Sequence, residues 1–310
     1  MPPRSSALPL SGLLAAAAAV VLGAGWQIAT RAGVRTSMTP IDLALLRYTV
    51  PALLLAPVWW RLLRHWPDGL SFSRVALMLV GGGLPFGLLA MAGARFAPAA
   101  DMGTMMAGAM PLAVALVAAL WLREAINTRR AIGLFLVMAA MVLVLVPSLL
   151  ANADGRWQGH LLFLSAAAAW ATYTVAYRAS GLEPWCATAL LALGSAVAIV
   201  PLWWLAGSDL TRVPAVELVW QILWQGVLAG VGGVWAYGAT VAALGAQRAG
   251  LSGALVPPTV TLGALILLGE VPSPTTLIAV VLATMGVVVA GWPGSTAEHA
   301  KSHATPSSRD

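Results

Sequence analysis

The feature that most constrains this chain is a succession of apolar stretches, each about 20 residues long, separated by short turns that carry charges, prolines or glycines. An α-helix of that length spans the hydrocarbon core of a bilayer. The composition agrees, because 60% of the 310 residues are hydrophobic and only 9% are charged, whereas soluble domains carry about 25% charged residues. The sequence therefore predicts an all-α polytopic membrane protein.

The apolar stretches divide into ten predicted transmembrane helices. Three of them begin at a proline, at Pro40, Pro184 and Pro274, where the missing N–H costs no helical hydrogen bond. The polar segment 294–310 is predicted to be a disordered cytoplasmic tail. The ten spans cover residues 10–30, 41–60, 74–94, 98–121, 129–149, 157–178, 184–206, 216–240, 248–269 and 274–292.

The basic residues indicate an orientation. With the N-terminus in the cytoplasm, eleven basic residues fall on the cytoplasmic side and five on the other, and positive charge accumulates inside. We therefore expect a multi-pass inner-membrane protein with both termini cytoplasmic. The net charge of +6 is scattered over these turns, so nucleic acid is not an expected partner. The five residues on the outer side are Arg31, Arg35, Arg95, Arg156 and Arg212.

The two halves of the chain resemble one another. They share four anchors in the same order, at an offset of 144 to 146 positions: Trp26 and Trp170, Pro40 and Pro184, Pro111 and Pro257, Glu124 and Glu270. We interpret residues 1–150 and 151–293 as two five-helix repeats. An odd number of helices places the second repeat in the membrane upside down, and inverted repeats are typical of carriers with a central site.

Several motifs resemble those of the drug/metabolite transporter superfamily, and in particular its EamA-type members. The second predicted helix reads "PIDLALLRYTVPALLL", and "LREAINTRRAIG" follows the fourth helix as "LGEVPSPTTLIAV" follows the ninth. The resemblance covers residues 10–292. It implies two inverted five-helix halves around a central cavity, and the transport of small organic solutes such as amino acids, nucleosides, other metabolites or drugs.

The ionisable residues argue against an enzyme. All eleven acids lie at predicted helix ends, in loops or in the tail, and the four histidines (His65, His160, His299 and His303) are expected to be peripheral. The single Cys186 offers no metal-ligand spacing, and no nucleotide-binding motif is present. We predict no catalytic residues, no metal and no cofactor. No acid is placed to relay protons, so the sequence indicates no coupling ion.

Arg47 is the one charged residue inside a predicted span. It is either a cavity cation that attracts the carboxylate of a substrate, or an arginine that reaches the membrane interface or pairs with a neighbouring helix end. The sequence leaves both readings open.

Aromatic and polar residues within the spans suggest a substrate pocket. Aromatic walls would bind the apolar part of a solute, and hydroxyl and amide groups its polar part. The alternative for each residue is packing against lipid or a neighbouring helix. The substrate-binding candidates are Trp26, Gln27, Arg47, Thr104, Trp170, Tyr173, Tyr177, Trp235 and Tyr237.

A second set of candidates has a structural or gating role. Four prolines within the spans free backbone carbonyls, which must be satisfied by neighbours or line a cavity. The two repeated glutamates follow their helices and are expected to cap the next helix or pair with basic residues rather than touch substrate. This set comprises Pro85, Pro111, Glu124, Pro257, Pro258 and Glu270.

Taken together, these features predict a secondary transporter that moves small organic solutes by alternating access. Amino acids or related metabolites are the favoured substrates, and export is an analogy from the family. The alternatives are a broad-specificity drug efflux carrier and, with less support, a membrane-embedded enzyme or receptor. The expected partners are the solute and the lipid bilayer, and the sequence does not decide between monomer and homodimer.

Overall fold

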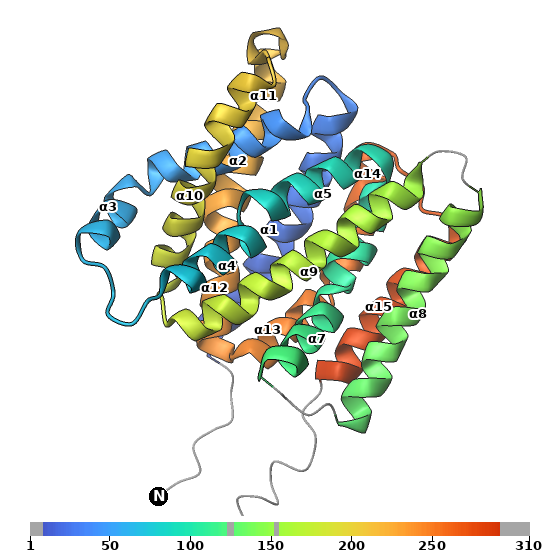
Figure 1. The fold of residues 1–310 in the computed structure, drawn as a ribbon. Helices are drawn as coiled ribbons and strands as arrows, with labels where there is room; N and C mark the ends of the chain where they lie inside the picture. The colour runs from blue at the N-terminus through green and yellow to red at the C-terminus, as the bar shows by residue number, and fades with distance from the viewer. Residues whose placement is uncertain (1–8, 123–126, 152–154, 292–310) are drawn as a thin grey trace, which may run out of the picture.

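Helix α1 (Leu10–Arg35) runs through the middle of a bundle of helices (Figure 1). The fold is seen in a computed structural model, which describes residues 9–122, 127–151 and 155–291. The helix extends five residues beyond the predicted span and includes Arg31 and Arg35. Its two ends define the two ends of the bundle, which we call the Leu10 end and the Arg35 end. The predicted tail, 294–310, lies outside the described residues.

The part of the chain that the structure describes is helical and contains no strand. The first half continues with α2 (Pro40–Leu54), α3 (Ala56–Arg64), α4 (Phe72–Gly82), α5 (Leu84–Phe96), α6 (Ala99–Met102), η1 (Gly103–Gly108), α7 (Met110–Leu122) and α8 (Thr128–Ala151). The second half comprises α9 (Arg156–Ser180), α10 (Pro184–Leu205), η2 (Leu210–Arg212), α11 (Ala215–Gln221), η3 (Ile222–Gly233), α12 (Val234–Leu244), α13 (Ala246–Gly253), α14 (Val256–Leu268) and α15 (Pro274–Gly291).

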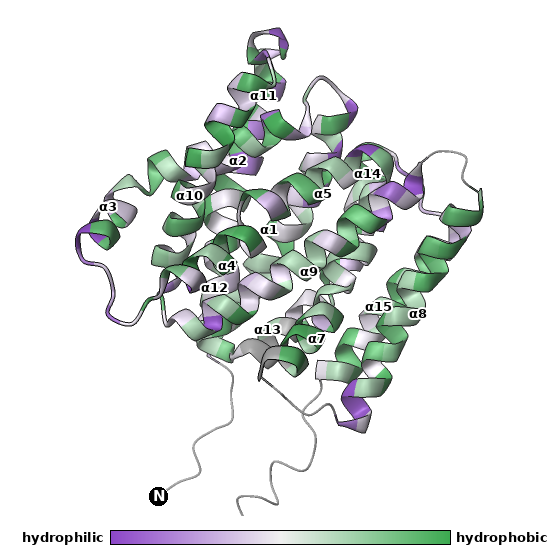
Figure 2. Ribbon diagram, viewed as in Figure 1, coloured by the Kyte–Doolittle hydropathy of each residue, from purple (hydrophilic) through white to green (hydrophobic). Residues whose placement is uncertain are grey.

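Eight helices in the described ranges are long and apolar enough to cross a membrane, and nine if the bent pair α2–α3 is one span. The 25-residue α9, which includes Arg156, His160 and Arg178, is not among them. Large apolar side chains such as Leu120, Phe135 and Ile266 are exposed on the outside of the bundle, and Figure 2 shows the apolar colouring along α8 and α10. Such surfaces match the hydrocarbon of a bilayer, so the chain is a polytopic helical membrane protein.

Helix starts follow the local sequence signals. Thr39 and Asp42 form a capping box at the start of α2, in which each side chain accepts a hydrogen bond from the other residue's backbone N–H. Pro40, Pro184 and Pro274 begin α2, α10 and α15, as predicted. These signals are local, so they act in the same way whatever the helices later pack against.

Several predicted spans are interrupted. The α2–α3 pair bends by 68° at Leu55, and α4 and α5 are separated at Gly83. At the second break the freed groups find partners, because Tyr48 donates to the Gly83 carbonyl at 2.6 Å and the Leu84 N–H donates to Ser195 Oγ at 3.0 Å. Backbone polar groups that lack helical partners are costly in a membrane unless they are satisfied in this way.

Two other spans contain π-helical turns. The segment η1 follows the short helix α6, and the longer segment η3 lies between α11 and α12. Wide turns of this kind are frequent at functional sites. Both segments face the middle of the bundle, where η1 packs against α14, and η3 against α1 and α2.

Small residues allow close helix packing. Helices α8 and α15 pack along much of their length, with Gly133 against the backbone of Gly286 and Ala290. A methyl group at Gly133 would overlap the Gly286 carbonyl oxygen and the Ala290 nitrogen. Contacts between small residues let helix backbones approach closely where the surrounding lipid offers no hydrophobic driving force.

Candidate functional site

A cavity of about 200 Å³ lies near the middle of the bundle, between α1, η1, α7, η3, α12 and α13. Its residues on α1 run from Ala19 to Gln27, on the Leu10 side of Arg31. Most of the wall is apolar or aromatic, and polar side chains are few. A concave, largely apolar site with a few placed polar groups is the usual form of a small-molecule site.

Arg47 lies on this wall, and its side chain is only 5% exposed. The guanidinium carbon is 4.2 Å from the centre of the Trp26 ring, a cation–π contact. Its Nε and Nη1 atoms are buried and have no hydrogen-bond partner. Arg47 therefore does not reach the membrane interface. It presents unpaired hydrogen-bond donors in the cavity.

The Trp26 ring that supports Arg47 is fixed by a network of amides. Trp26 Nε1 donates to Gln225 Oε1 at 2.9 Å, and Gln225 Nε2 lies 3.1 Å from Thr30 Oγ1 and 3.2 Å from Gln221 Oε1. Gln221 Nε2 in turn donates to the Ala29 carbonyl at 2.9 Å. These contacts join α1 of the first half to α11 and η3 of the second half. Residues of both halves therefore position the Trp26 ring.

Gln27 is the second polar group of the cavity and is 2% exposed. Its Nε2 donates to the Gly23 carbonyl at 3.4 Å, while its buried Oε1 has no partner. A buried polar atom without a partner costs about 1–3 kcal/mol. The cavity thus contains an unpaired acceptor at Gln27 as well as unpaired donors at Arg47.

Aromatic rings form a continuous wall. The ring centres of Trp26 and Phe86 are 5.6 Å apart, those of Phe86 and Trp170 are 4.9 Å apart, and those of Trp170 and Tyr237 are 5.4 Å apart. Thr174 donates to the Trp170 carbonyl at 2.9 Å, so it accepts from the Tyr237 hydroxyl at 3.2 Å. All of these residues line the cavity, and the wall fixes rigid apolar surfaces around it.

Five of the predicted substrate-binding residues lie on the cavity wall, and four do not. The five are Trp26, Gln27, Arg47, Trp170 and Tyr237. Thr104 is buried and donates to the Ala100 carbonyl at 3.0 Å. Tyr173 packs against Gly81 and Gly82 with Tyr177 stacked on it, and Trp235 stacks on Trp185 at 5.3 Å between ring centres.

The four candidate prolines each lie in the first turn of a helix that follows an interruption. Pro85 lies at the start of α5, Pro111 at the start of α7, and Pro257 and Pro258 at the start of α14. A proline in a first turn removes no helical hydrogen bond. They therefore mark where a span restarts instead of bending a continuous helix. Pro111 also lines the cavity.

Glu270 links three helix ends at the Arg35 end of the bundle. Its Oε1 accepts from Arg31 Nε at 2.7 Å and from Arg35 Nη1 at 3.2 Å, and its Oε2 accepts from the Ala99 N–H at 2.9 Å. We call these four residues the Glu270 cluster. Glu270 therefore pairs with basic residues, as predicted, and both arginines belong to α1. The helix start that it contacts is that of α6, whereas the prediction named the helix that follows Glu270 in the sequence, α15. Its repeat partner Glu124 lies outside the described residues.

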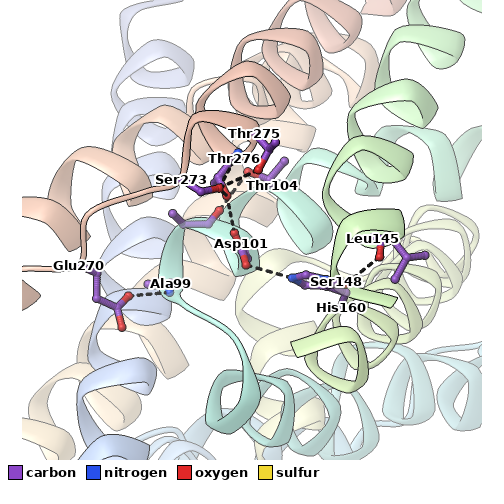
Figure 3. Close-up of polar contacts among 11 residues, drawn as sticks. Ala99, Asp101, Thr104, Leu145, Ser148, His160, Glu270, Ser273, Thr275 and Thr276 are labelled. Carbon is purple, nitrogen blue, oxygen red and sulfur yellow. Dashed lines mark hydrogen bonds and ion pairs between the residues drawn. The ribbon is translucent and has the colours of Figure 1, made fainter. Parts of the chain in front are cut away.

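Sequence reasoning missed a buried pair of ionisable groups. Asp101 and His160 were expected at the periphery, but they are only 3% and 1% exposed. Asp101 Oδ2 and His160 Nε2 are 3.0 Å apart, and Asp101 Oδ1 accepts from Thr276 Oγ1 at 2.9 Å (Figure 3). Both residues lie near the starts of their helices, and the sequence analysis therefore placed them at the membrane interface. No local sequence pattern predicts that they contact each other.

No group of three or more His, Cys, Asp or Glu side chains with metal-site geometry occurs within residues 9–122, 127–151 and 155–291.

An apolar-surfaced bundle of helices around a central cavity defines the class: an integral membrane protein. The model of the EamA-like transporter family matches the chain twice, over residues 10–146 and 157–292. The chain belongs to this family of membrane transporters of small solutes.

A solved structure titled only "Crystal structure of protein" resembles the chain with a TM-score of 0.61 and 21% sequence identity, covering 90% of this chain and 96% of the other. At that identity the likeness shows the fold. No curated protein matches the sequence.

Proposed function

We propose that the chain is a secondary transporter that carries small organic solutes with a carboxylate group, with amino acids as the favoured class. It would work by alternating access in the inner membrane, with both termini in the cytoplasm. Export is the favoured direction, by analogy with the family. In this proposal the protein has ten transmembrane spans in two inverted halves, residues 1–150 and 151–293, and α9 is the sixth span.

The observation that carries the proposal is the pair of unsatisfied polar groups in the cavity. Arg47 offers unpaired donors and Gln27 an unpaired acceptor, each on a side chain at most 5% exposed. A carboxylate satisfies the guanidinium with charge-assisted hydrogen bonds, and an ammonium group satisfies the amide oxygen. An amino-acid backbone carries both groups on one carbon, so it fits both demands.

The remaining walls suit an apolar side chain. The rings of Phe86, Trp170 and Tyr237 bound the space beside Arg47 and Gln27. Such surfaces bury the hydrocarbon part of a solute at about 25 cal/mol per Å². A volume of about 200 Å³ suits a solute of amino-acid size.

The packing of the helices supports two related halves. Helix α1 of the first half packs on η3, α12 and α14 of the second. Correspondingly, α9, its counterpart in the second half, packs on α4, α5 and α7 of the first. In addition, α2 packs on α10 and α8 packs on α15, and each of these pairs joins counterparts to each other. Most of these contacts are paired between the halves, as two related repeats would be, although the packing of α2 on η3 has no equally extensive counterpart between α10 and α4 or α5.

The polar groups at the Arg35 end support alternating access. The Glu270 cluster ties α1 to α6 and α14, and Thr36 and Ser37 donate to Glu217 on α11. The cavity lies on the Leu10 side of these contacts. We propose that they form the closed outer gate of an inward-facing carrier.

A broad-specificity drug efflux carrier is the second candidate. The largely apolar cavity wall favours it, since such a wall selects weakly among hydrophobic solutes. The two candidates differ in their dependence on Arg47.

The test is transport by purified protein reconstituted in liposomes, with a labelled panel of amino acids, nucleosides and organic cations. We expect uptake of amino acids. Arg47→Ala should reduce their apparent affinity roughly 10–100-fold, because hydrogen bonds to charged groups contribute about 1.5–3 kcal/mol. Neutral solutes should change little. Equal transport of cations and amino acids that is insensitive to Arg47→Ala would favour drug efflux, and no transport of any class by folded protein would refute the carrier proposal.

A further inference from the structure

Asp101 and His160 join four helices through a continuous hydrogen-bond network. His160 on α9 contacts Asp101 on α6 at 3.0 Å and Ser148 on α8 at 2.9 Å. Thr276 on α15 donates to the other Asp101 oxygen at 2.9 Å. None of these residues lines the central cavity, so the proposed substrate site does not account for the network.

The hydroxyl of Ser148 fixes where one proton of the imidazole lies. Ser148 Oγ donates its single hydrogen to the Leu145 carbonyl at 2.7 Å, so toward His160 it only accepts. His160 Nδ1 therefore carries a hydrogen. A second proton must then lie between His160 Nε2 and Asp101 Oδ2, either on the ring or on the carboxyl group, because the bond exists only with a hydrogen between these atoms.

The pair thus holds one exchangeable proton. With it, the pair is neutral overall and the 3.0 Å contact is favourable. Without it, the network is one hydrogen short and one of its hydrogen bonds has to break: either the contact between Asp101 and His160, or the bond from Ser148 to Leu145 if the imidazole hydrogen moves to Nε2. Gain or loss of one proton therefore makes or breaks one hydrogen bond of the network that joins α6, α8 and α9.

A chain of hydroxyl groups leads from the surface to the pair (Figure 3). Thr276 Oγ1 gives its hydrogen to Asp101, so it accepts from Ser273 Oγ at 2.8 Å. Ser273 Oγ then accepts from Thr275 Oγ1 at 2.8 Å, and Thr275 is exposed. A proton that binds at Thr275 displaces one hydrogen along each bond in turn and places one on Asp101 Oδ1. Rotation of the carboxyl group, whose torsion is soft, brings it to His160.

Asp101 is also mechanically connected to the cavity. It lies in the four-residue helix α6, which continues directly into η1, and Met106 and Ala107 of η1 line the cavity. The start of α6 is also held in place, because the Ala99 N–H donates to Glu270. Movement of α6 relative to α9 would therefore reach both the cavity wall and the Glu270 cluster.

We propose that Asp101 and His160 form a proton-binding site that couples solute transport to the proton gradient. This inference rests on the proposed transport function. Proton binding from the Arg35 end through Thr275 holds α6 on α9, as in this structure. Release of the proton to the cytoplasmic side then frees α6, and with it η1 and the Glu270 cluster.

The charged groups around the pair belong to neighbouring helices. Glu270 contacts the start of α6 and is itself paired with Arg31 and Arg35. Arg95 at the end of α5 and Arg156 at the start of α9 are exposed. The sequence of α15 contains no charged residue. Within the described residues, Asp101 and His160 therefore form their ion pair with each other and not with any of these charged groups.

Asp101→Asn is the informative variant, because an asparagine copies the protonated carboxyl group. Its amide oxygen accepts from Thr276 and its NH₂ donates to His160, so the variant should fold with an unchanged melting temperature. In liposomes, wild-type protein should accumulate a transported amino acid when a pH gradient is imposed. Asp101→Asn should exchange the same solute between the two sides at no gradient, but it should no longer accumulate it.

The matched controls separate coupling from packing. His65→Gln changes an exposed histidine and should leave accumulation intact. Thr276→Val keeps the size of the side chain but interrupts the hydroxyl chain, so accumulation should be slower while exchange is unchanged. If wild-type transport ignores the pH gradient, or if Asp101→Asn still accumulates solute, the proposal is wrong.

A second measurement needs no solute and keeps this proposal separate from the transport function. In protein with isotope-labelled histidine, the His160 signal is identified by its loss in His160→Asn. Between about pH 5 and about pH 8, where histidines usually titrate, that signal should change with pH in wild-type protein and stay constant in Asp101→Asn. A wild-type signal that is constant, or the same titration in both proteins, would overturn the proton site even if transport is observed.

Discussion

The Arg47 guanidinium lies 4.2 Å from the centre of the Trp26 ring and has no partner at Nε or Nη1. The ring supports the flat face of the guanidinium, and the donors along its edge are buried without a protein partner. Trp26 is itself held by Gln225 of the second half. The orientation of the cavity cation therefore depends on contacts between the two halves.

The first prediction uses a substitution that keeps the charge. Arg47→Lys retains a cation but loses the planar fork and its stacking on Trp26. The apparent affinity for amino acids should fall about tenfold, which corresponds to about 1.4 kcal/mol, and uptake of neutral solutes should be unaffected. Arg61→Lys, at an exposed position on α3, is the control. Full activity of Arg47→Lys would show that charge alone is needed.

The second prediction concerns the unpaired oxygen of Gln27. Gln27→Met has a similar shape but no acceptor, so it should weaken substrates that present an ammonium group. We expect about a tenfold loss of affinity for an amino acid and little change for the corresponding acid without the amino group, because a buried unmet donor costs about 1–3 kcal/mol. Competition assays with the two ligands measure this directly. An equal loss for both would assign Gln27 a packing role.

The third prediction compares two tryptophans of the second half. Trp170 lines the cavity, whereas Trp235 stacks on Trp185 away from it. Trp170→Leu should weaken aromatic amino acids more than small ones, by roughly 2–10-fold for the lost ring contacts, and Trp235→Leu should leave the apparent affinity unchanged. The experiment is a set of uptake curves for phenylalanine and alanine, with thermal unfolding as a check on folding. The reverse order of effects would place the substrate elsewhere.

The fourth prediction tests the closure of the Arg35 end. Glu270→Gln removes the negative charge that holds Arg31 and Arg35. In a Cys186→Ser background, a cysteine at the buried Ala94, whose carbonyl accepts from Arg31, should react faster with a membrane-impermeant maleimide. Asp209→Asn, which removes an exposed ion pair with Arg212, should leave the rate unchanged. An unchanged rate in Glu270→Gln would mean that the cluster does not close this end.

The sequence predicted the features of the fold that local patterns determine. Apolar length and composition gave an all-helical membrane protein, and the signals at Pro40, Pro184 and Pro274 located three helix starts. The break at Gly83 could not be predicted in the same way. Its freed carbonyl and the next N–H are satisfied by Tyr48 and Ser195, which come from other helices.

The site was less predictable, because helical spacing does not say which face a helix turns inward. Trp170, Tyr173 and Tyr177 share one helix face, yet only Trp170 lines the cavity, since Tyr173 packs over Gly81 and Gly82. The Asp101–His160 pair was missed because its members are 59 positions apart on different helices. Their meeting depends on the packing of α6 on α9.

The wide turns of η3 have a consequence for the direction in which α12 faces. In an α-helix each residue advances the side-chain direction by about 100°, and a π turn contains one residue more than an α turn. If one turn of η3 tightened to α geometry, the helix beyond it would rotate by about that angle relative to α11. Tyr237 would then leave the cavity wall and a neighbouring side chain would replace it. The segment η3, of which Ala229 and Gly233 line the cavity, could thus rotate α12 and change the cavity lining without unfolding the span.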